Sequence, residues 1–144
     1  MASEQKTLKA KLAWSAPIEY SSDNAASVPK KPGVYEIIVK LKDNGGKRRY
    51  VGESDDLRTR FSQHLQDDEP NKCVKDKVRN KTSFFRYVEP IESKDDRKDV
   101  EKKLYDLYEH ECNSPPNGQP PPGSGREVVT DLTEIPADEI VRLP

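Results

Sequence analysis

Residues 33–60 read GVYEIIVKLKDNGGKRRYVGESDDLRTR, and the interpretation of the whole chain starts from this stretch. Two tyrosines, Tyr35 and Tyr50, stand fifteen positions apart in it, and Arg60 comes eight positions after Gly52. Two phenols, a guanidinium and a glycine lie within one short segment. We interpret this concentration as a candidate binding or catalytic site.

The first part of the stretch is predicted to be a β-hairpin. Residues 34–41 are rich in β-branched side chains, which favour an extended strand. Residues 43–46 read Asp-Asn-Gly-Gly and tolerate the positive φ angles of a tight turn. Residues 47–52 then return as a second strand, which brings Tyr35 and Tyr50 within cross-strand reach.

The end of the stretch is predicted to begin a helix. Ser54 can cap its N-terminus. Arg60 and His64 are four positions apart and share a line at the border between core and solvent. From that border a charged group can enter a cleft while its aliphatic stem packs. The buried stripe of the helix consists of Leu57, Phe61 and Leu65.

The remaining chain adds two helices and a third strand. Asn71 can cap a short basic helix, and the aromatic-rich residues 82–88 indicate a strand. A last helix begins at Asp95 or Asp96 and places Glu101 at the edge of its buried face. On spacing alone, such a glutamate is usually a solvated residue. The apolar face of this helix consists of Val100, Leu104, Leu107 and Tyr108.

The two tripeptides of the opening stretch resemble those of the GIY-YIG nuclease superfamily. They read Gly-Val-Tyr at 33–35 and Tyr-Val-Gly at 50–52, each with valine in place of isoleucine. The family places an arginine on its first helix at the spacing that Arg60 occupies.

Later markers extend the resemblance from about Pro32 to Asn113. His64 stands where many homing endonucleases of the family have a histidine. Glu101, with Asn113 twelve positions on, matches the family's helical glutamate and the asparagine that follows it. Five markers in order at matching spacings make a specific signal.

The resemblance implies an α/β (α+β) fold in which helices flank a small three-stranded antiparallel sheet. It also implies a metal-dependent endonuclease that hydrolyses DNA phosphodiester bonds. Glu101 would then be a ligand of Mg²⁺ or Mn²⁺, because these hard cations prefer oxygen ligands. Arg60 would pair with phosphate oxygens in a fork geometry that lysine lacks.

Other roles are implied less sharply. Tyr35 is the candidate general base or water-orienting phenol, and Tyr50 the second hydrogen-bonding phenol, although the sequence does not separate the two roles. His64 either orients a tyrosine, contacts phosphate or lies on the helix surface. Asn113 braces the metal-bearing helix or contacts phosphate. The residues expected in structural turns are Gly33 and Gly52.

Overall charge and local charge point in different directions. The net charge of −1 argues against a generic nucleic-acid binder, but residues 72–86 hold six Lys or Arg against one acidic residue. Screening limits the reach of a charge to about 8–10 Å at physiological salt, so local sign matters more. Taken alone, such charge runs usually form an ordinary solvated surface. The family resemblance in the middle of this basic region reverses that preference and implies DNA as the partner. The candidate contacts for nucleic acid are Lys47, Arg48, Arg49, Arg58, Lys72, Lys75, Lys77 and Arg79.

Composition limits the other classes of protein. Charged residues make up 35% of the chain, and no apolar run reaches the about 18 residues of a membrane span. We expect an intracellular protein, cytoplasmic or nucleoid-associated, with no membrane partner. Cys73 and Cys112 are expected as reduced thiols, His110 is expected on the surface, and none of them shows zinc-ligand spacing.

We expect three regions in the chain. Residues 1–31 form an extension that packs on the core, and residues 32–113 form the nuclease domain. Residues 114–144 form a proline- and glycine-rich loop and an acidic tail, with a short strand at 127–129 and a helical turn at 137–142. No DNA-targeting domain is visible, so specificity would come from loops, a homo-oligomer or a partner protein.

Two alternative functions follow from the same residues. One is a nucleic-acid-binding module that keeps the fold without turnover, against which the full set of markers counts. The other is a domain that docks partner proteins through its proline-rich residues 114–123.

Overall fold

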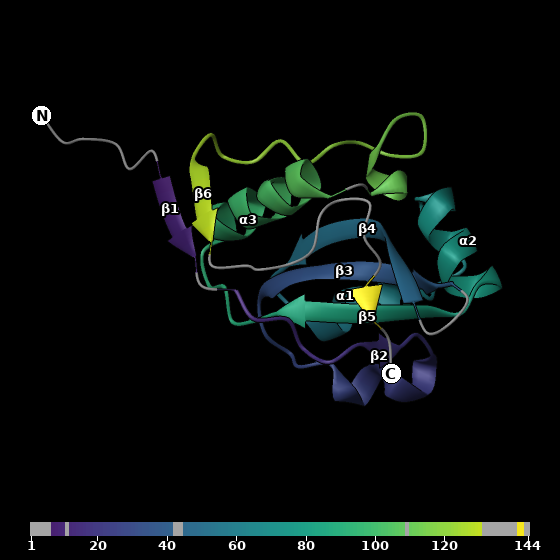
Figure 1. Cartoon of the computed structure of the whole chain (residues 1–144). Coiled ribbons are helices and arrows are strands. Elements are labelled where there is room, and N and C mark those ends of the chain that lie inside the picture. The colour runs from purple at the N-terminus through teal and green to yellow at the C-terminus, as the bar shows by residue number, and fades with distance from the viewer. Residues whose placement is uncertain (1–6, 11, 42–44, 109, 131–140, 143–144) are drawn as a thin grey trace, which may run out of the picture.

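An antiparallel sheet forms the centre of the computed structural model, which describes residues 7–10, 12–41, 45–108, 110–130 and 141–142. The order of its strands is β2-β5-β3-β4-β7, and the three long strands in the middle are those expected from the sequence (Figure 1). Their bounds are β3 Gly33–Lys40, β4 Gly45–Ser54 and β5 Ser83–Val88.

The described sheet has five strands rather than the three that were expected. The additional strands, β2 (Ile18–Glu19) and β7 (Val141–Arg142), each have two residues. So short a segment carries no alternation of apolar residues, and its position depends on the partner strand. A separate two-stranded parallel sheet joins β1 (Thr7–Ala10) to β6 (Glu127–Thr130).

Three α-helices surround the central sheet: α1 (Leu57–Gln63), α2 (Lys72–Asn80) and α3 (Lys94–Leu107). Their N-caps are Asp56, Asn71 and Ser93, and each cap side chain accepts a backbone N–H of the first turn. Asn71 agrees with the expectation. Ser54 instead ends β4, and its hydroxyl bonds to the Asp56 backbone.

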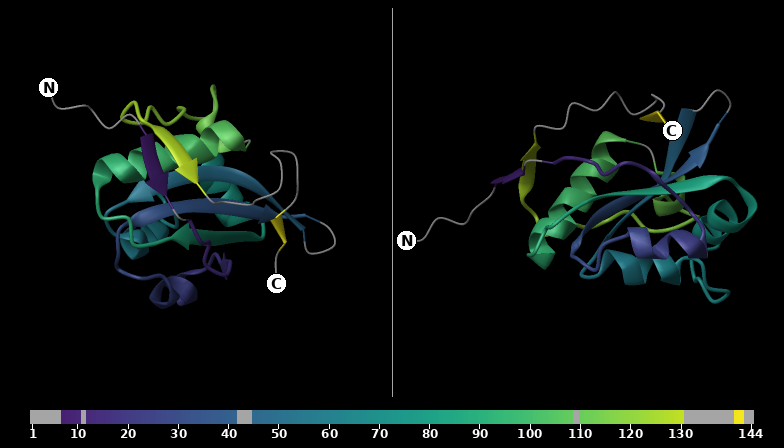
Figure 2. Two further views of the ribbon diagram at one scale, coloured as in Figure 1. Left: turned by 60° about the vertical axis from the view of Figure 1, so that its left-hand side comes forward. Right: turned by 90° about the horizontal axis from the view of Figure 1, so that it is seen from below.

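The helices lie on opposite faces of the sheet, as the two views of Figure 2 show. Alternation along β3 divides the core, because successive side chains of a strand point to opposite faces. Tyr35 and Ile37 pack with α1, α2 and the 3₁₀ helix η1 (Ser22–Ser27), whereas Val34 packs with α3. The N-terminal Tyr20 and Val28 also belong to the core on the Tyr35 side.

Several local expectations need correction. Leu107, expected on the buried face of α3, is 40% exposed. Gly45 and Gly46, expected in the turn, begin β4, while residues 42–44 lie outside the described residues. Val141 and Arg142 form β7 rather than a helical turn, and residues 137–140 are not described. Among the described helices, none combines the length and apolarity needed to cross a membrane.

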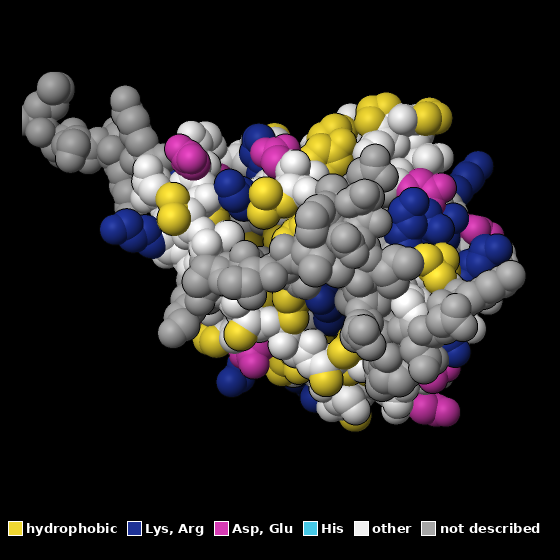
Figure 3. Space-filling model, in the orientation of Figure 1, with side chains coloured by type: hydrophobic (Ala, Val, Ile, Leu, Met, Phe, Trp, Pro, Cys, Tyr) yellow, Lys and Arg dark blue, Asp and Glu magenta, His cyan; other side chains and the backbone are white. Residues whose placement is uncertain are grey.

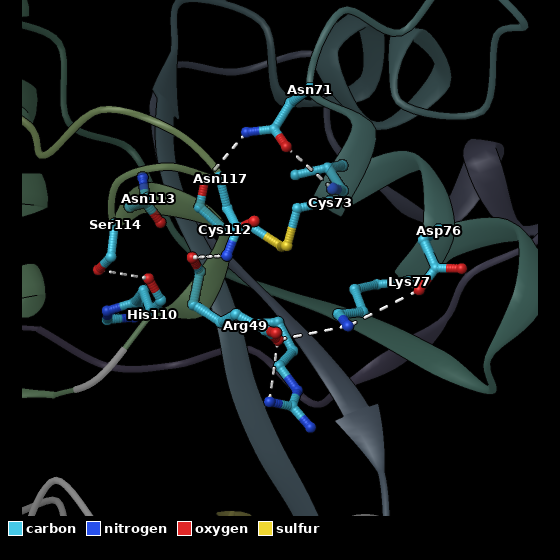
Figure 4. The surroundings of a disulfide bond; sticks show 12 residues. Arg49, Asn71, Cys73, Asp76, Lys77, His110, Cys112, Asn113, Ser114 and Asn117 are labelled. Atoms are coloured by element: carbon cyan, nitrogen blue, oxygen red, sulfur yellow. Dashed lines mark hydrogen bonds and ion pairs between the residues drawn. A yellow bond between two sulfur atoms is a disulfide. The ribbon is translucent and has the colours of Figure 1, made fainter.

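Cys73 and Cys112 form a disulfide, so the expectation of two reduced thiols is wrong (Figure 4). The bond joins α2 to the short 3₁₀ helix η3 (Glu111–Asn113) across 39 positions of sequence. Asn71 adds to the same junction, because its side-chain amide donates to the Cys112 carbonyl at 3.0 Å. The pairing could not be inferred from a sparse cysteine count.

A buried cluster of charges lies on the α3 side of β3. Glu36 is fully buried, and the Arg86 guanidinium donates two hydrogen bonds to its Oε1 at 2.6 and 3.0 Å. Its Oε2 lies 2.7 Å from His110 Nε2 and 3.4 Å from Arg48 Nε. Burial alone would raise the pKa of Glu36, but these cationic partners outweigh it and lower the pKa to about 2. His110 is therefore a buried residue, 1% exposed, and not a surface one.

Candidate active site

The site-forming residues gather at an edge of the central sheet. Strand β4 pairs with β7 only at Gly45 and Gly46, so its C-terminal half is an edge of the described sheet. Edge strands present unpaired backbone groups. Asn113 satisfies those of Val51, accepting its N–H at 2.8 Å and donating to its carbonyl at 2.9 Å. The Asn113 amide thus substitutes for a neighbouring strand and braces β4 rather than the glutamate-bearing helix.

Both motif glycines lie inside strands, where they make room for other groups. Tyr35 is opposite Gly52, and a Cβ built on Gly52 would come within 2.3 Å of the Tyr35 hydroxyl. A Cβ on Gly33 would lie 2.3 Å from the Val88 carbonyl oxygen and 2.9 Å from Leu57. The sequence therefore requires glycine here for close packing and not for the turns that were expected.

Tyr35 is paired with His64 on the α1 side of the sheet. The Tyr35 hydroxyl oxygen lies 2.7 Å from His64 Nε2, and both residues are buried. His64 follows the last residue of α1 and caps its C-terminus. The spacing of Arg60 and His64 on one helical line is thus what brings the imidazole to the strand tyrosine.

A pocket of about 470 Å³ opens beside this pair. Arg60 lines it, and within the described part of the chain its guanidinium forms no hydrogen bond or ion pair. A half-buried cation without a protein partner is suited to bind an anion. The full lining consists of Tyr50, Arg60, Gln63, His64, Gln66, Asp68, Glu69, Pro70 and Asn71.

Glu101 approaches the same site from α3. Burial, together with the charge of Glu53, raises its pKa to about 8, and Lys98 and Arg60 oppose this rise. No described residue forms a hydrogen bond or ion pair with the Glu101 carboxylate. Glu53, in contrast, accepts a hydrogen bond from Arg97 Nε at 2.9 Å. Of these two half-buried carboxyl groups, Glu53 has a cationic partner and Glu101 has none among the described residues. The charge cluster is therefore incomplete.

The two tyrosines keep their protons in this structure. Burial raises the pKa of Tyr35 well above its usual value. Burial, and next the charge of Glu101, raises the pKa of Tyr50 to about 12, although Arg60 opposes this effect. Tyr50 lines the pocket, whereas Tyr35 lies behind it. Neither phenol is ionised near neutral pH without a further cation or a proton acceptor.

The residues present fit a divalent cation in part. Glu101 supplies a carboxylate whose charge is poorly compensated. Glu53 is a further acidic group, close enough for its charge to raise the pKa of Glu101. A bound cation would remove the penalty of ionising Glu101. No group of three acidic, histidine or cysteine ligands is found among the described residues, so water and a phosphate would complete the shell.

The candidate contacts for nucleic acid differ in what they bind within the protein. Arg48 is 2% exposed and lies over the Tyr108 ring, with 3.9 Å between the guanidinium carbon and the ring centroid. Arg58 donates to the carbonyls of Val28 and Ala26. These two arginines hold structure together in the conformation observed.

The other basic candidates lie nearer the surface. Lys77 and Arg49 both contact Glu111, at 3.3 and 3.0 Å. Arg79 and Lys75 both bond to Asp67. The candidates classed as exposed and without an ion pair to a described residue are Lys47 and Lys72. On the face of the molecule drawn in Figure 3, dark-blue Lys and Arg side chains likewise lie beside magenta Asp and Glu side chains.

Sequence reasoning missed two acidic residues of the site. Glu53 directly follows the Tyr-Val-Gly tripeptide, and Glu69 lies within 3.2 Å of His64 Nδ1. The position of Glu53 beside the tripeptide was a usable signal. Glu69 gave none, because it falls in an irregular acidic segment between two helices.

The family comparison agrees with this geometry. A family model described as the GIY-YIG catalytic domain matches residues 31–113, which include every motif residue discussed above. No curated protein and no solved structure matches the chain. Since the match spans more than half of the sequence, the chain belongs to the GIY-YIG family, and its mixed sheet-and-helix fold is that of a GIY-YIG nuclease domain.

Proposed function

We propose that this protein is a metal-dependent endonuclease that hydrolyses phosphodiester bonds of DNA at the pocket beside Tyr50. The observation that carries the proposal is the unpartnered Arg60 guanidinium, which lines the same pocket as Tyr50 and His64. Tyr35 and Glu101 adjoin them. An anion site flanked by proton-transfer groups and a buried carboxylate suits phosphate-ester hydrolysis.

Arg60 and Glu101 have separate electrostatic roles in this proposal. Arg60 binds non-bridging oxygens of the scissile phosphate and offsets the negative charge that grows during attack. Glu101, with Glu53 nearby, would hold Mg²⁺ or Mn²⁺. The cation would polarise the phosphate and stabilise the leaving oxygen.

Tyr35 and His64 handle the proton of the attacking water. A phenol with a raised pKa is a poor base by itself, but the Tyr35 hydroxyl is paired with the imidazole of His64. Tyr35 can therefore accept a proton from water only as it passes its own to His64. Because Tyr35 is buried, the attacking water must enter beside it from the pocket, and Tyr50 orients that water from the pocket side.

Braced backbone keeps these groups in position. The Asn113 amide holds Val51, which lies between Tyr50 and Gly52 in β4. Small displacements of reacting groups are costly in catalysis, so this brace supports the geometry rather than touching the substrate. Specificity for a duplex site, a junction or a lesion is assigned to loops, an oligomer or a partner.

Cleavage of supercoiled plasmid and of a branched-DNA panel in Mg²⁺ or Mn²⁺ tests the proposal. Wild type is compared with Glu101→Ala and Glu101→Gln. Glu19→Gln is the matched control, because Glu19 is exposed and lies outside the matched domain. We expect cleavage by wild type and the control, and a loss of at least about 10²-fold in both Glu101 variants.

Three other outcomes would change the interpretation. Binding without product on any substrate, by folded protein, would favour the non-catalytic module. Cleavage by both Glu101 variants would assign the activity to another site or to a contaminant. Undiminished cleavage with a chelator present would remove the metal from the mechanism.

A further inference from the structure

Glu69 lies behind the Tyr35–His64 pair, on the side of the imidazole away from the tyrosine. Its Oε1 is 3.2 Å from His64 Nδ1, and the side chains of His64 and Glu69 are 3% and 7% exposed. The approach has the distance of an ion pair without the alignment of a full hydrogen bond, since Nδ1 has no hydrogen-bond partner. Glu69 is therefore the buried acidic group that faces this nitrogen.

The contacts of the two ring nitrogens indicate which of them carries the proton in neutral His64. A proton on Nε2 would leave the Nδ1 lone pair against a carboxylate oxygen, which is electrostatically unfavourable. A proton on Nδ1 places an N–H beside the Glu69 carboxylate, at the 3.2 Å of an ion pair, and leaves the Nε2 lone pair to accept from the Tyr35 hydroxyl. The second arrangement is electrostatically favourable at both nitrogens, because it keeps a lone pair away from the carboxylate and gives Tyr35 an acceptor.

We propose that Glu69 is a positioning residue that holds His64 in its Nδ1-protonated tautomer, so that Nε2 accepts the proton of Tyr35. This inference rests on the proposed nuclease function for its catalytic meaning. The tautomer itself is a property of the protein without substrate. A carboxylate orients the base histidine of hydrolytic triads in the same physical way.

The proton balance of the relay is complete. The attacking water gives a proton to the Tyr35 oxygen as the Tyr35 hydroxyl proton moves to His64 Nε2. The water oxygen bonds to phosphorus, the bond to the leaving ester oxygen breaks, and that oxygen takes a proton from solvent. His64 is then an imidazolium with Nδ1–H beside the Glu69 carboxylate, and it returns its extra proton to solvent.

The other charged and titratable groups around His64 do not duplicate this role. Tyr35 from β3 faces Nε2, and Tyr50 from β4 presents a ring edge at 5.6 Å between ring centroids. Arg60 lies one turn earlier on the same helix and is a cation, which cannot accept the Nδ1 proton. Asp68 lines the pocket, but no described contact joins it to His64.

Nitrogen NMR of the histidine rings tests the inference directly. The chain has only two histidines, so the His64 resonances are assigned by comparison with a His64→Gln sample. Wild type is compared with Glu69→Gln, Glu69→Ala and Asp68→Asn, each checked for folding by urea unfolding. Asp68→Asn removes the same charge from the same pocket without touching the imidazole.

We expect protonated Nδ1 and unprotonated Nε2 in wild type and Asp68→Asn, and a shift toward the Nε2-protonated form in Glu69→Ala. Glu69→Gln should lie between them, because its amide oxygen can still accept from Nδ1. In cleavage assays Glu69→Ala should lower kcat about 10–100-fold with little change in KM.

An Nε2-protonated ring in wild type, or an unchanged tautomer in folded Glu69→Ala, would overturn the inference. If no DNA is cut by any variant, the proposed function fails on its own. The spectra then still decide whether Glu69 sets the tautomer.

Discussion

Two neighbouring residues of β3, Tyr35 and Glu36, point to opposite faces of the sheet, and each lies 2.7 Å from a histidine. On the Glu36 side, the buried carboxylate has three close partners, Arg86, Arg48 and His110. Both ring nitrogens of His110 face acceptors, Glu36 Oε2 and the Tyr108 carbonyl, an arrangement that a protonated imidazole satisfies.

Around Tyr35 and the pocket, the charged side chains lack such close partners among the described residues. Arg60 has no described ion-pair partner, and burial raises the pKa values of the neighbouring phenols of Tyr35 and Tyr50. Glu101, which comes to the site from α3, has its pKa raised to about 8 by burial. A buried carboxylate held by close cationic partners stabilises or specifies the fold, whereas charged groups without close partners beside a pocket can bind a ligand. The comparison thus assigns a structural role to the Glu36 cluster and a chemical role to the groups around the Tyr35–His64 pair and the pocket.

The largest effect that would test this contrast is on activity at Tyr35. Removal of its hydroxyl in Tyr35→Phe should lower kcat by about 10²–10⁴-fold, because the water loses its proton acceptor. The free energy of unfolding should fall by only about 1 kcal/mol, the usual net worth of one hydrogen bond. Plasmid cleavage and urea unfolding measure the two quantities.

Tyr87→Phe is the matched control for Tyr35→Phe. Tyr87 lies on β5, directly opposite Tyr35 of β3, and also packs near Phe85. Its hydroxyl has no hydrogen bond with a described residue. It should keep wild-type kcat. Equal losses in both variants would mean that packing of the aromatic layer, and not proton transfer, limits the reaction.

The opposite face should respond in stability. Glu36→Gln keeps the shape of the side chain but leaves Arg86, Arg48 and His110 without their shared anion. Breaking a buried pair from one side costs about 3–5 kcal/mol, so urea unfolding should show a loss of this size. Glu19→Gln, at an exposed position, should change stability by less than about 0.5 kcal/mol.

The Glu36 cluster should also make the free energy of unfolding depend on pH in the acid range. The pKa of Glu36 is about 2 in the folded protein against an ordinary value of 4.5. Between these values the unfolded chain binds more protons, so this stabilisation is present above about pH 4.5 and is lost as pH falls through about 2. Glu36→Gln should flatten that part of the stability curve, and an unchanged slope would assign the acid sensitivity to other carboxylates.

Local patterns predicted the framework of both faces. The β-branched run of β3, the Asn71 cap of α2 and the spacing of Arg60 and His64 are all encoded within a few residues. The sequence therefore predicted the three long strands, the helices and the group of motif side chains.

Long-range partners could not be predicted in the same way. His110 bonds to Glu36 across 74 positions, and Asn113 to Val51 across 62. Such pairings depend on how whole elements pack, so the sequence predicted a surface position for His110 and did not reveal that Asn113 bonds to β4. Glu53 and Glu69 were missed because an acidic residue in a strand end or loop is usually solvated.

The disulfide is the next contact to test, since it joins α2 on the Tyr35 side to the η3 turn that follows His110. Cys73→Ser with Cys112→Ser should lower the free energy of unfolding by about 2–4 kcal/mol, the usual worth of a bridge that closes such a loop. Because Asn113 is adjacent to Cys112, kcat should also fall modestly. Alkylation without reductant that labels two free thiols in purified protein would contradict the bond.

Lys72 should give the smallest effect, and it asks whether DNA follows the open face. Lys72 is exposed on α2, near the pocket residue Asn71, whereas the exposed Lys9 lies on β1 beyond α3. Lys72→Ala should weaken binding to all sequences alike and reduce the slope of log K against log salt by about 1. Lys9→Ala should leave the slope unchanged. An equal loss for both lysines would show that DNA association is spread over the molecule rather than directed to the side of the sheet where Tyr35 and the pocket lie.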